Sequence, residues 1–219
     1  MFDPAQLWKN RFSGFIRETS RYLRYIFNGH LVVVLLFLAG TFGFYYQEWV
    51  KTLDPGFPAA LIAAFVLSLA VTISPVVTFL TEADKVFILP LETRLGSYLK
   101  RSAIFSIFLQ SYIVLFLLAI LMPMQAAVSG QGFRPFFYYL LVLVGMKAAN
   151  MWIRWRVQYF IEQSVWHIDS VVRFLLNGGV IYLLFSGAYL LSLVLGAVLL
   201  LLLYYYSAQT ADKGLKWSA

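Results

Sequence analysis

The residues best suited to chemistry in this chain are a few polar side chains that interrupt long apolar runs. They are hydroxyls and amides, namely Thr72, Ser74, Gln110, Ser111, Asn150 and Asn177. Such groups donate and accept hydrogen bonds, but none of them is a strong nucleophile or base without an activating partner. Inside a membrane they either join helices or line a path for a polar part of a substrate. For Gln110, Asn150 and Asn177 we keep both interpretations, helix packing and substrate path.

Enzymatic motifs are missing from the sequence. There are no cysteines, which excludes disulfides and thiolate chemistry, and the two histidines, His30 and His167, flank predicted spans. The chain has no G-x-x-x-x-G-K-[ST], H-E-x-x-H or G-x-S-x-G motif. Its acidic residues fall near the ends of the predicted spans, which argues against an intramembrane proton relay. We therefore predict no catalytic residue, no metal site and no cofactor.

The composition is that of a membrane protein with several spans. Hydrophobic residues make up 61% of the 219 residues and charged residues 12%, and the mean hydropathy is +0.77. A soluble domain carries about 25% charged residues. Several runs reach about 20 residues without a charge, the length needed to cross a bilayer. We predict an all-α, multi-pass membrane protein, and we interpret the net charge of +7 as a sign of orientation rather than of nucleic-acid binding.

The apolar runs predict about six spans within a transmembrane domain at residues 31–206. They are residues 31–49, 57–80, 103–127, 135–152, 171–185 and 187–206, with cytoplasmic connectors at 81–102 and 153–170 and a tail at 207–219. The last two spans are separated at 186-SGA-188, because the apolar block is too long for one span. We expect Ser74-Pro75 to kink the second span.

Positive charge predicts the orientation of these spans. Of the 17 Lys and Arg residues, all but Lys51 and Arg134 fall on one side of a six-span topology. Because Lys and Arg concentrate in cytoplasmic loops, both termini are expected in the cytoplasm. The first 30 residues do not resemble a signal peptide, since a mixed segment precedes the first apolar run.

Residues 1–30 predict an amphipathic helix at the inner membrane interface. Aromatic and aliphatic residues recur at helical spacing, and Arg17, Arg21 and Arg24 form a stripe on another face. Such a helix lies with its apolar side in the lipid bilayer and its arginines at anionic headgroups. The helix either fixes the first span sideways or only anchors the topology.

Two further segments carry charge next to a predicted span. Lys147, Asn150 and Arg154 share one face at the inner end of the fourth span, where we expect Lys147 to reach the membrane surface. The connector 153–170 that follows has a second amphipathic pattern, with apolar residues at helical spacing.

The stretch 79-FLTEADKVFILPLETRLGSYLKRS-102 has charged ends around an apolar centre. Thr81 to Asp84 has the form of a helix N-cap with acids in the first turn. Pro90 favours the start of a second helix and disfavours helix at Leu89. We predict two short helices around Pro90 that either bind a protein partner or lie at the membrane interface.

At this point the chain resembles a known family, the EcsB-type membrane subunits of bacterial ABC transporters. The resemblance rests on 11-RFSGFIRETSRYLRYIFNGH-30, on 80-LTEADKVFILPLE-92 and on 152-WIRWR-156. It implies a permease in the bacterial cell membrane that works with a separate, EcsA-like ATPase subunit. It also implies export of short peptides or other hydrophobic substrates, with links to secretion and intramembrane proteolysis. Members of the family are longer, so the tail 207–219 is expected to be truncated relative to them.

The resemblance turns the 79–102 stretch into a hypothetical ATPase-docking element. Its contact residues are expected to be Glu82, Asp84, Lys85, Phe87, Ile88, Glu92 and Arg94. A homodimer is one arrangement that matches two ATPase subunits. The alternative is a membrane scaffold that regulates secretion or intramembrane proteolysis without transport. An intramembrane enzyme ranks last, because no nucleophile–base or metal pattern occurs.

Overall fold

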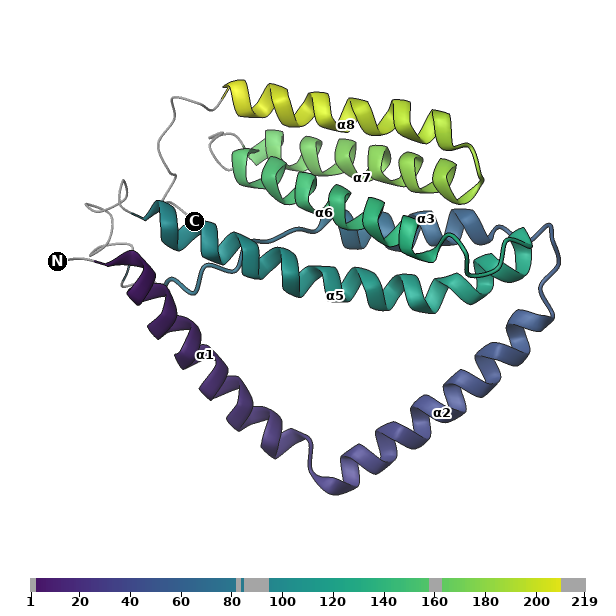
Figure 1. Cartoon of the computed structure of the whole chain (residues 1–219), viewed down its shortest axis with the longest axis horizontal. Coiled ribbons are helices and arrows are strands. Elements are labelled where there is room, and N and C mark those ends of the chain that lie inside the picture. Colours follow the sequence, from purple (N-terminus) through teal and green to yellow (C-terminus); the bar gives the residue numbers. More distant parts are fainter. Residues whose placement is uncertain (1–2, 82–83, 85–94, 158–162, 210–219) are drawn as a thin grey trace. The chain divides into compact units, whose positions relative to one another are not determined.

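The chain is all-helical over the part that the structure describes. The computed structural model describes residues 3–81, 84, 95–157 and 163–209, with side chains of 157 and 163–165 left aside. Figure 1 shows the helices, which are α1 (Pro4–Ile26), α2 (Gly29–Lys51), α3 (Ala59–Thr72), α5 (Gly96–Ser129), α6 (Phe136–Val157), α7 (Gln163–Phe185) and α8 (Tyr189–Gln209). No strand occurs among these residues.

Five of these helices are long and apolar enough to cross a membrane. They are α2, α5, α6, α7 and α8, and the shorter apolar helix α3 has 14 residues. A helix of that length measures about 21 Å, less than the hydrocarbon core of about 30 Å. All six predicted spans coincide with an apolar helix, so the predicted multi-span helical fold is confirmed. The orientation of the termini stays a prediction.

The predicted amphipathic segment at residues 1–30 forms α1. Asp3 caps its N-terminus by accepting hydrogen bonds from the N–H groups of Ala5 (2.9 Å) and Gln6 (3.3 Å), and Pro4 occupies the first turn. The helix ends at a corner, where Asn28 accepts from the N–H of Leu31 at 2.9 Å and starts α2. No residue of α1 is buried in the structure. Near its start Trp8 and Phe12 lie close to Phe79, whereas Leu23 and Ile26 are exposed, so the later part of its apolar face is open to a surrounding phase such as the bilayer interface.

Helix α3 ends before the predicted kink at Ser74-Pro75. We expected a kinked span to residue 80, but α3 stops at Thr72 and the chain continues without helix from Ile73 to Thr81. Proline has no N–H to donate back to the helix, and it disfavours the helical conformation of the residue before it. The proline thus terminates the helix, and the expectation of a kink was wrong.

The connectors also differ in detail from the prediction. Residues Gly96 to Arg101, expected in a separate short helix, belong to the 34-residue helix α5, which is longer than a single span needs. The described parts of connector 153–170 extend α6 and α7 instead of forming a helix between them. The remainder of both predicted connector helices lies outside the described residues.

The predicted break at 186-SGA-188 is confirmed as the turn between α7 and α8. Gly187 has a φ of +81°, which favours glycine because other residues meet steric strain there. The Ala188 N–H donates to the Leu183 carbonyl at 2.9 Å, and the Gly187 N–H donates to the Leu184 carbonyl at 3.3 Å. These two bonds form a Schellman motif, which closes the C-terminus of α7.

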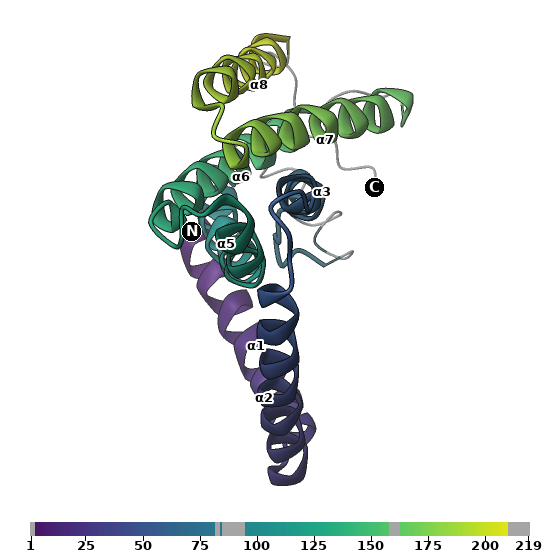
Figure 2. The same ribbon diagram turned by 90° about the vertical axis from the view of Figure 1, so that its right-hand side faces the viewer.

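The described chain divides into two compact units. One unit comprises Met1–Thr52 with Val77–Ile104, and the other comprises Leu53–Val76 with Phe105–Ala219. In the second unit α7 packs against both α3 and α8, as Figure 2 shows, and α6 contacts the same three helices. Small residues permit the α3–α7 contact, because a Cβ atom added at Gly178 would lie 3.8 Å from Ser68 Cβ.

The contact between α3 and α7 predicts a disulfide in a cysteine-free background. The Cβ atoms of a Ser68→Cys, Gly178→Cys pair would lie about 3.8 Å apart, the usual separation in a disulfide. We expect oxidation in membranes to protect both thiols from a maleimide-polyethylene glycol reagent, read as a gel shift. The pair Ser68→Cys, Gly145→Cys is the control, because nothing lies within 4 Å of a Cβ at Gly145. Equal labelling of the two pairs would contradict the α3–α7 packing.

Candidate functional site: a buried polar cluster at the end of helix α3

The C-terminus of α3 exposes backbone carbonyls that helices normally leave without partners. The last four C=O groups of any helix lack an intrahelical donor. Here the Ile73 N–H satisfies the Leu69 carbonyl at 3.1 Å, and the Ser74 hydroxyl donates to the Val71 carbonyl at 2.7 Å. Ser74 is fully buried. Water is scarce at membrane depth, so the other carbonyls also need donors from the protein.

Lys147 of α6 supplies two of these donors. Its ammonium group donates to the Ala70 carbonyl and, at 2.5 Å, to the Ile73 carbonyl. The residue is only 3% exposed, so the expectation that Lys147 reaches the membrane surface was wrong. The free carbonyls at the end of α3 attract the ammonium group inward, because a cation is favourable at the negative end of a helix dipole.

Gln110 of α5 and Arg173 of α7 satisfy two further carbonyls of the same segment. Gln110 Nε2 donates to the Pro75 carbonyl at 2.5 Å, and Arg173 Nη1 lies 3.4 Å from the Thr72 carbonyl. Side chains from three different helices therefore converge on the interruption of α3. This convergence defines the candidate functional site, which we call the α3-end cluster.

Asn150 of α6 and Asn177 of α7 form a reciprocal amide pair within the α3-end cluster. Asn150 Nδ2 donates to Asn177 Oδ1 at 3.0 Å, and Asn177 Nδ2 donates to Asn150 Oδ1 at 2.9 Å. Asn150 also donates to the Met146 carbonyl, and Asn177 to the Thr72 hydroxyl, both at 2.9 Å. Both asparagines are fully buried. Every donor of the pair is therefore used within the protein.

Asp169 balances the charge of Arg173. Its Oδ2 atom lies 2.8 Å from Arg173 Nε and 2.7 Å from Nη2, and both side chains are about 98% buried or more. Arg173 Nη1 also donates to Asn150 Oδ1 at 3.2 Å. The side chain of Tyr206 on α8 is an electrostatic neighbour of this pair. A buried charge is tolerated when it is paired and fully hydrogen-bonded, as it is here.

The sequence analysis missed the roles of Asp169, Arg173 and Thr72. Asp169 was expected near the end of a predicted span, and Arg173 was counted among the positive charges of the cytoplasmic side. The spacing of Asp169 and Arg173, four residues apart on one helix, was the available signal for an ion pair. Nothing in the sequence indicated that this pair is buried or that it meets α3.

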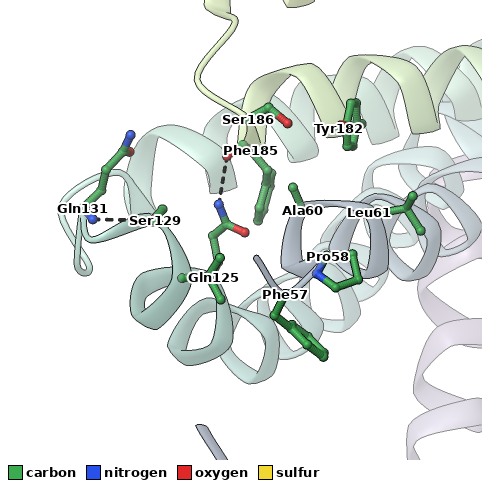
Figure 3. A pocket seen from close by; sticks show the side chains of 11 residues that line it. Phe57, Pro58, Ala60, Leu61, Gln125, Ser129, Gln131, Tyr182, Phe185 and Ser186 are labelled. Carbon is green, nitrogen blue, oxygen red and sulfur yellow. Dashed lines mark hydrogen bonds between the residues drawn. The ribbon is translucent and has the colours of Figure 1, made fainter. Parts of the chain in front are cut away.

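The predicted substrate-path residues take part in hydrogen bonds between helices in this structure. Asn150 and Asn177 are completely enclosed, and Gln110 is 7% exposed. None of the three lines the cavity of about 280 Å³ beside α5 and α6 or the cavity of about 410 Å³ at the ends of α3, α5 and α7 (Figure 3). The geometry favours the helix-packing interpretation, while the substrate-path role stays a prediction.

Of the predicted docking residues, Asp84 lies within the described part of the chain. Its carboxylate accepts hydrogen bonds from the Thr81 N–H at 2.8 Å, which is one arm of a capping box, and from the Thr81 hydroxyl at 2.9 Å. It also pairs with Arg11 of α1 at 2.8 Å, and its side chain is 9% exposed. Thr81 as the N-cap of a following helix stays a prediction, because most of residues 82–94 lie outside the described part of the chain. Asp84 anchors the segment to α1. Glu82, Lys85, Phe87, Ile88, Glu92 and Arg94 lie outside the described residues.

Aromatic side chains hold the chain just before Thr81 against α1. Phe79 has a φ of +57°, which is unusual for a residue with a Cβ atom. Its ring lies 5.1 Å from that of Phe15 and 6.1 Å from that of Phe12, measured between centroids. The Tyr98 hydroxyl adds a 2.6 Å hydrogen bond to the Thr78 carbonyl. The start of the predicted docking element therefore has a fixed attachment inside the first unit.

The predicted lipid-contacting arginines are exposed. Arg17, Arg21 and Arg24 all lie on α1 with solvent-accessible side chains. This placement is compatible with contacts to anionic headgroups, which stay a prediction.

These features define a class: a multi-pass helical membrane protein whose interrupted third helix is held by buried polar side chains. Comparison with known proteins then gives the family. The family model described as "Bacterial ABC transporter protein EcsB" matches residues 5–219, and the chain belongs to the EcsB family. The chain is also similar to "Protein EcsB" of Bacillus subtilis (strain 168), with 32% identity over 220 residues.

That similarity covers 100% of this chain and 54% of the relative, so the chain spans about half of the relative's length. No solved structure matches the chain. Family membership and the apolar helices together make it a multi-pass membrane protein of a family that is described as a bacterial ABC transporter protein.

Lys147→Met is expected to lower the free energy of unfolding by about 1–3 kcal/mol, because buried carbonyls lose a charged donor. Methionine is nearly as long as lysine, so the packing around position 147 changes little. An unfolding titration with SDS in mixed micelles measures the effect. Arg154→Met is the control, because Arg154 lies exposed on the same helix and its loss should stay within about 0.5 kcal/mol. A Lys147→Met variant as stable as the wild type would show that desolvation of the ammonium group outweighs its hydrogen bonds.

A double-mutant cycle on Asp169 and Arg173 tests the buried ion pair. Asp169→Asn and Arg173→Gln should each cost about 3 kcal/mol, because each leaves one buried charge without its partner. The double variant should cost less than the sum of the single variants, since no charge is left uncompensated. Additive effects in the same SDS titration would exclude an energetic coupling between the two side chains.

Proposed function

We propose that this chain is the membrane permease part of an ABC transporter. It exports short peptides or other hydrophobic substrates, and a separate, EcsA-like ATPase subunit drives it. The α3-end cluster is the observation that carries this proposal. Transporters commonly interrupt helices within the membrane, because the break supplies backbone groups and a joint where helices move. Membership of a family described as an ABC transporter protein supports the same conclusion.

The ATPase is a separate chain in this proposal, because this sequence carries no P-loop motif. We place its docking surface at residues 82–94. Two described features support this placement. The segment begins at a turn in which Thr81 donates hydrogen bonds to Asp84, and Arg11 and the aromatic side chains of α1 hold that turn. A contact point that transmits motion needs such a fixed attachment, since a loose loop would absorb the displacement.

Coupling requires two arrangements of the spans with different affinities for the ATPase–nucleotide complex. The α3-end cluster is a suitable bistable element, because its bonds join α3 to α5, α6 and α7. Exchange of the carbonyl partners of Lys147 and Arg173 would shift these helices without leaving either cation without a hydrogen-bond acceptor. A homodimer would present two docking segments to two ATPase subunits.

Reconstitution tests the transport function directly. The chain and its ATPase are placed together in liposomes, and movement of a fluorescent apolar peptide is followed with and without ATP. ATP-dependent accumulation on the side opposite the ATPase is expected. A hydrolysis-deficient ATPase is the control. Binding of the ATPase without any ATP-dependent movement would favour a regulatory scaffold instead.

The double substitution Phe87→Asp, Ile88→Asp is expected to reduce ATPase co-purification at least about tenfold, because charge replaces the apolar centre of the proposed docking segment. The ratio of the two subunits after affinity purification measures the effect. Phe133→Asp is the matched control, because Phe133 is 60% exposed in a predicted outer loop. Unchanged association and unchanged ATP turnover in the double variant would remove the docking role of this segment.

A further inference from the structure

The apolar stripe of α1 contacts the rest of the protein along only part of its length. In the first half of the helix, the rings of Phe12 and Phe15 lie 6.1 Å and 5.1 Å from the ring of Phe79. The stripe continues at helical spacing with Leu23 and Ile26, which are 44% and 56% exposed. One continuous face therefore has a half that contacts the protein and a half that is open.

Positive charge lies behind the open half of this stripe. Arg17, Arg21 and Arg24 are exposed and fall on the opposite face of the helix, and Glu18 is the one acidic residue between positions 17 and 24. An apolar face with cations behind it matches an anionic lipid surface. The apolar side chains enter the acyl boundary there, and the arginines reach the phosphates.

The corner between α1 and α2 also indicates a membrane as the occupant of this face. Only Phe27 and Asn28 separate the two helices. The Phe27 N–H donates to the Leu23 carbonyl at 2.7 Å, and Asn28 accepts from the Leu31 N–H at 2.9 Å. Helix α2 is long and apolar enough to cross a membrane. The open half of α1 therefore lies within a few residues of the point where the chain enters the bilayer.

The first half of α1 holds two other segments of the first unit. Trp8 Nε1 donates to Ser102 Oγ at 3.1 Å, and Arg11 pairs with Asp84 at 2.8 Å. Figure 1 shows the start of α1 beside the start of α5. The positive φ of Phe79 persists only where surrounding contacts enforce it. We call these contacts, together with the packing on Phe79, the α1 clamp.

We propose that an anionic membrane surface, bound by the second half of α1, keeps the α1 clamp closed. The helix is continuous from Trp8 to Ile26, about 27 Å, so lipid that holds one end restricts the motion of the other. Anchoring one contact of a linked pair raises the effective concentration of the second. Any consequence for ATPase docking rests on the proposed function, whereas the response of the clamp to lipid does not.

The test reads the clamp at Ser102, at the end of α1 remote from the lipid contact. The chain has no cysteine, so Ser102→Cys adds a single buried thiol whose reaction with an uncharged maleimide reports opening. The full chain is placed, without ATPase, in nanodiscs of phosphatidylcholine alone or mixed equally with phosphatidylglycerol. Labelling should be at least about fivefold slower in the mixed nanodiscs, the effect of one arginine near an anionic surface. Ala208→Cys, exposed at the end of α8, corrects for any effect of lipid charge on the reaction itself.

Variants in the Ser102→Cys background separate the two halves of α1. Replacing the three arginines at 17, 21 and 24 by glutamine should give equal labelling rates in both lipids. The matched control replaces three other exposed cations and should keep the difference, namely Lys9→Gln, Arg134→Gln and Arg154→Gln.

The apolar contact with lipid has its own pair of variants. Leu23→Ser with Ile26→Ser should label rapidly in both lipids, because the open half loses its apolar anchor. Tyr25→Ser is the control, because Tyr25 is 78% exposed on the same turn but lies off the apolar face. Trp8→Ala should label rapidly in either lipid and gives the rate of the open clamp.

Three results would overturn the inference. They are equal labelling of Ser102→Cys in the two lipids, an unchanged lipid response after loss of the three arginines, and labelling of Trp8→Ala no faster than that of its parent. Slowing by glycerol phosphate in detergent would also contradict it, since a free anion would then replace the membrane surface. A lipid response without ATP-driven movement in liposomes would remove the exporter and leave the clamp, and the reverse result would do the opposite.

Discussion

The fold depends on the need to satisfy the backbone carbonyls at the end of α3. Helix α3 ends after 14 residues, shortly before Pro75, and the chain continues without helix from Ile73 to Thr81. Ser74, Gln110, Lys147 and Arg173 provide the missing donors. A buried carbonyl left without a donor costs about 1–3 kcal/mol, and these donors offset that cost at the end of α3.

The same requirement explains the arrangement of the second unit. The donors belong to α5, α6 and α7, so satisfying α3 also fixes where these helices approach it. The asparagine pair and the Asp169–Arg173 ion pair then complete the cluster without an unpaired charge on the arginine. Because each member has a partner on another helix, a shift of one helix must rearrange several bonds together. That property suits a transporter joint better than a rigid scaffold.

In the first unit, the described contacts attach the start of a charged segment to the amphipathic helix α1. The Asp84 carboxylate accepts a hydrogen bond from the Thr81 N–H and forms an ion pair with Arg11. The Phe79 ring contacts α1, and the positive φ of Phe79 costs of order 1–3 kcal/mol. Strain of this kind persists only where surrounding contacts enforce it. In the proposed permease role, these contacts would give the docking segment a firm attachment to α1.

The sequence by itself determined the helical membrane fold, the amphipathic α1 and the break at Gly187. Each of these follows from local physics: hydropathy over a span, helical periodicity and the conformational freedom of glycine. Only the tertiary structure decided that Ser74-Pro75 ends α3, that Lys147 turns inward and that Arg173 meets Asn150. Those outcomes depend on donors and acceptors up to about a hundred residues apart, such as Thr72 and Arg173. A single sequence shows which polar groups exist, but the pairing of buried groups is set by the packing of whole helices.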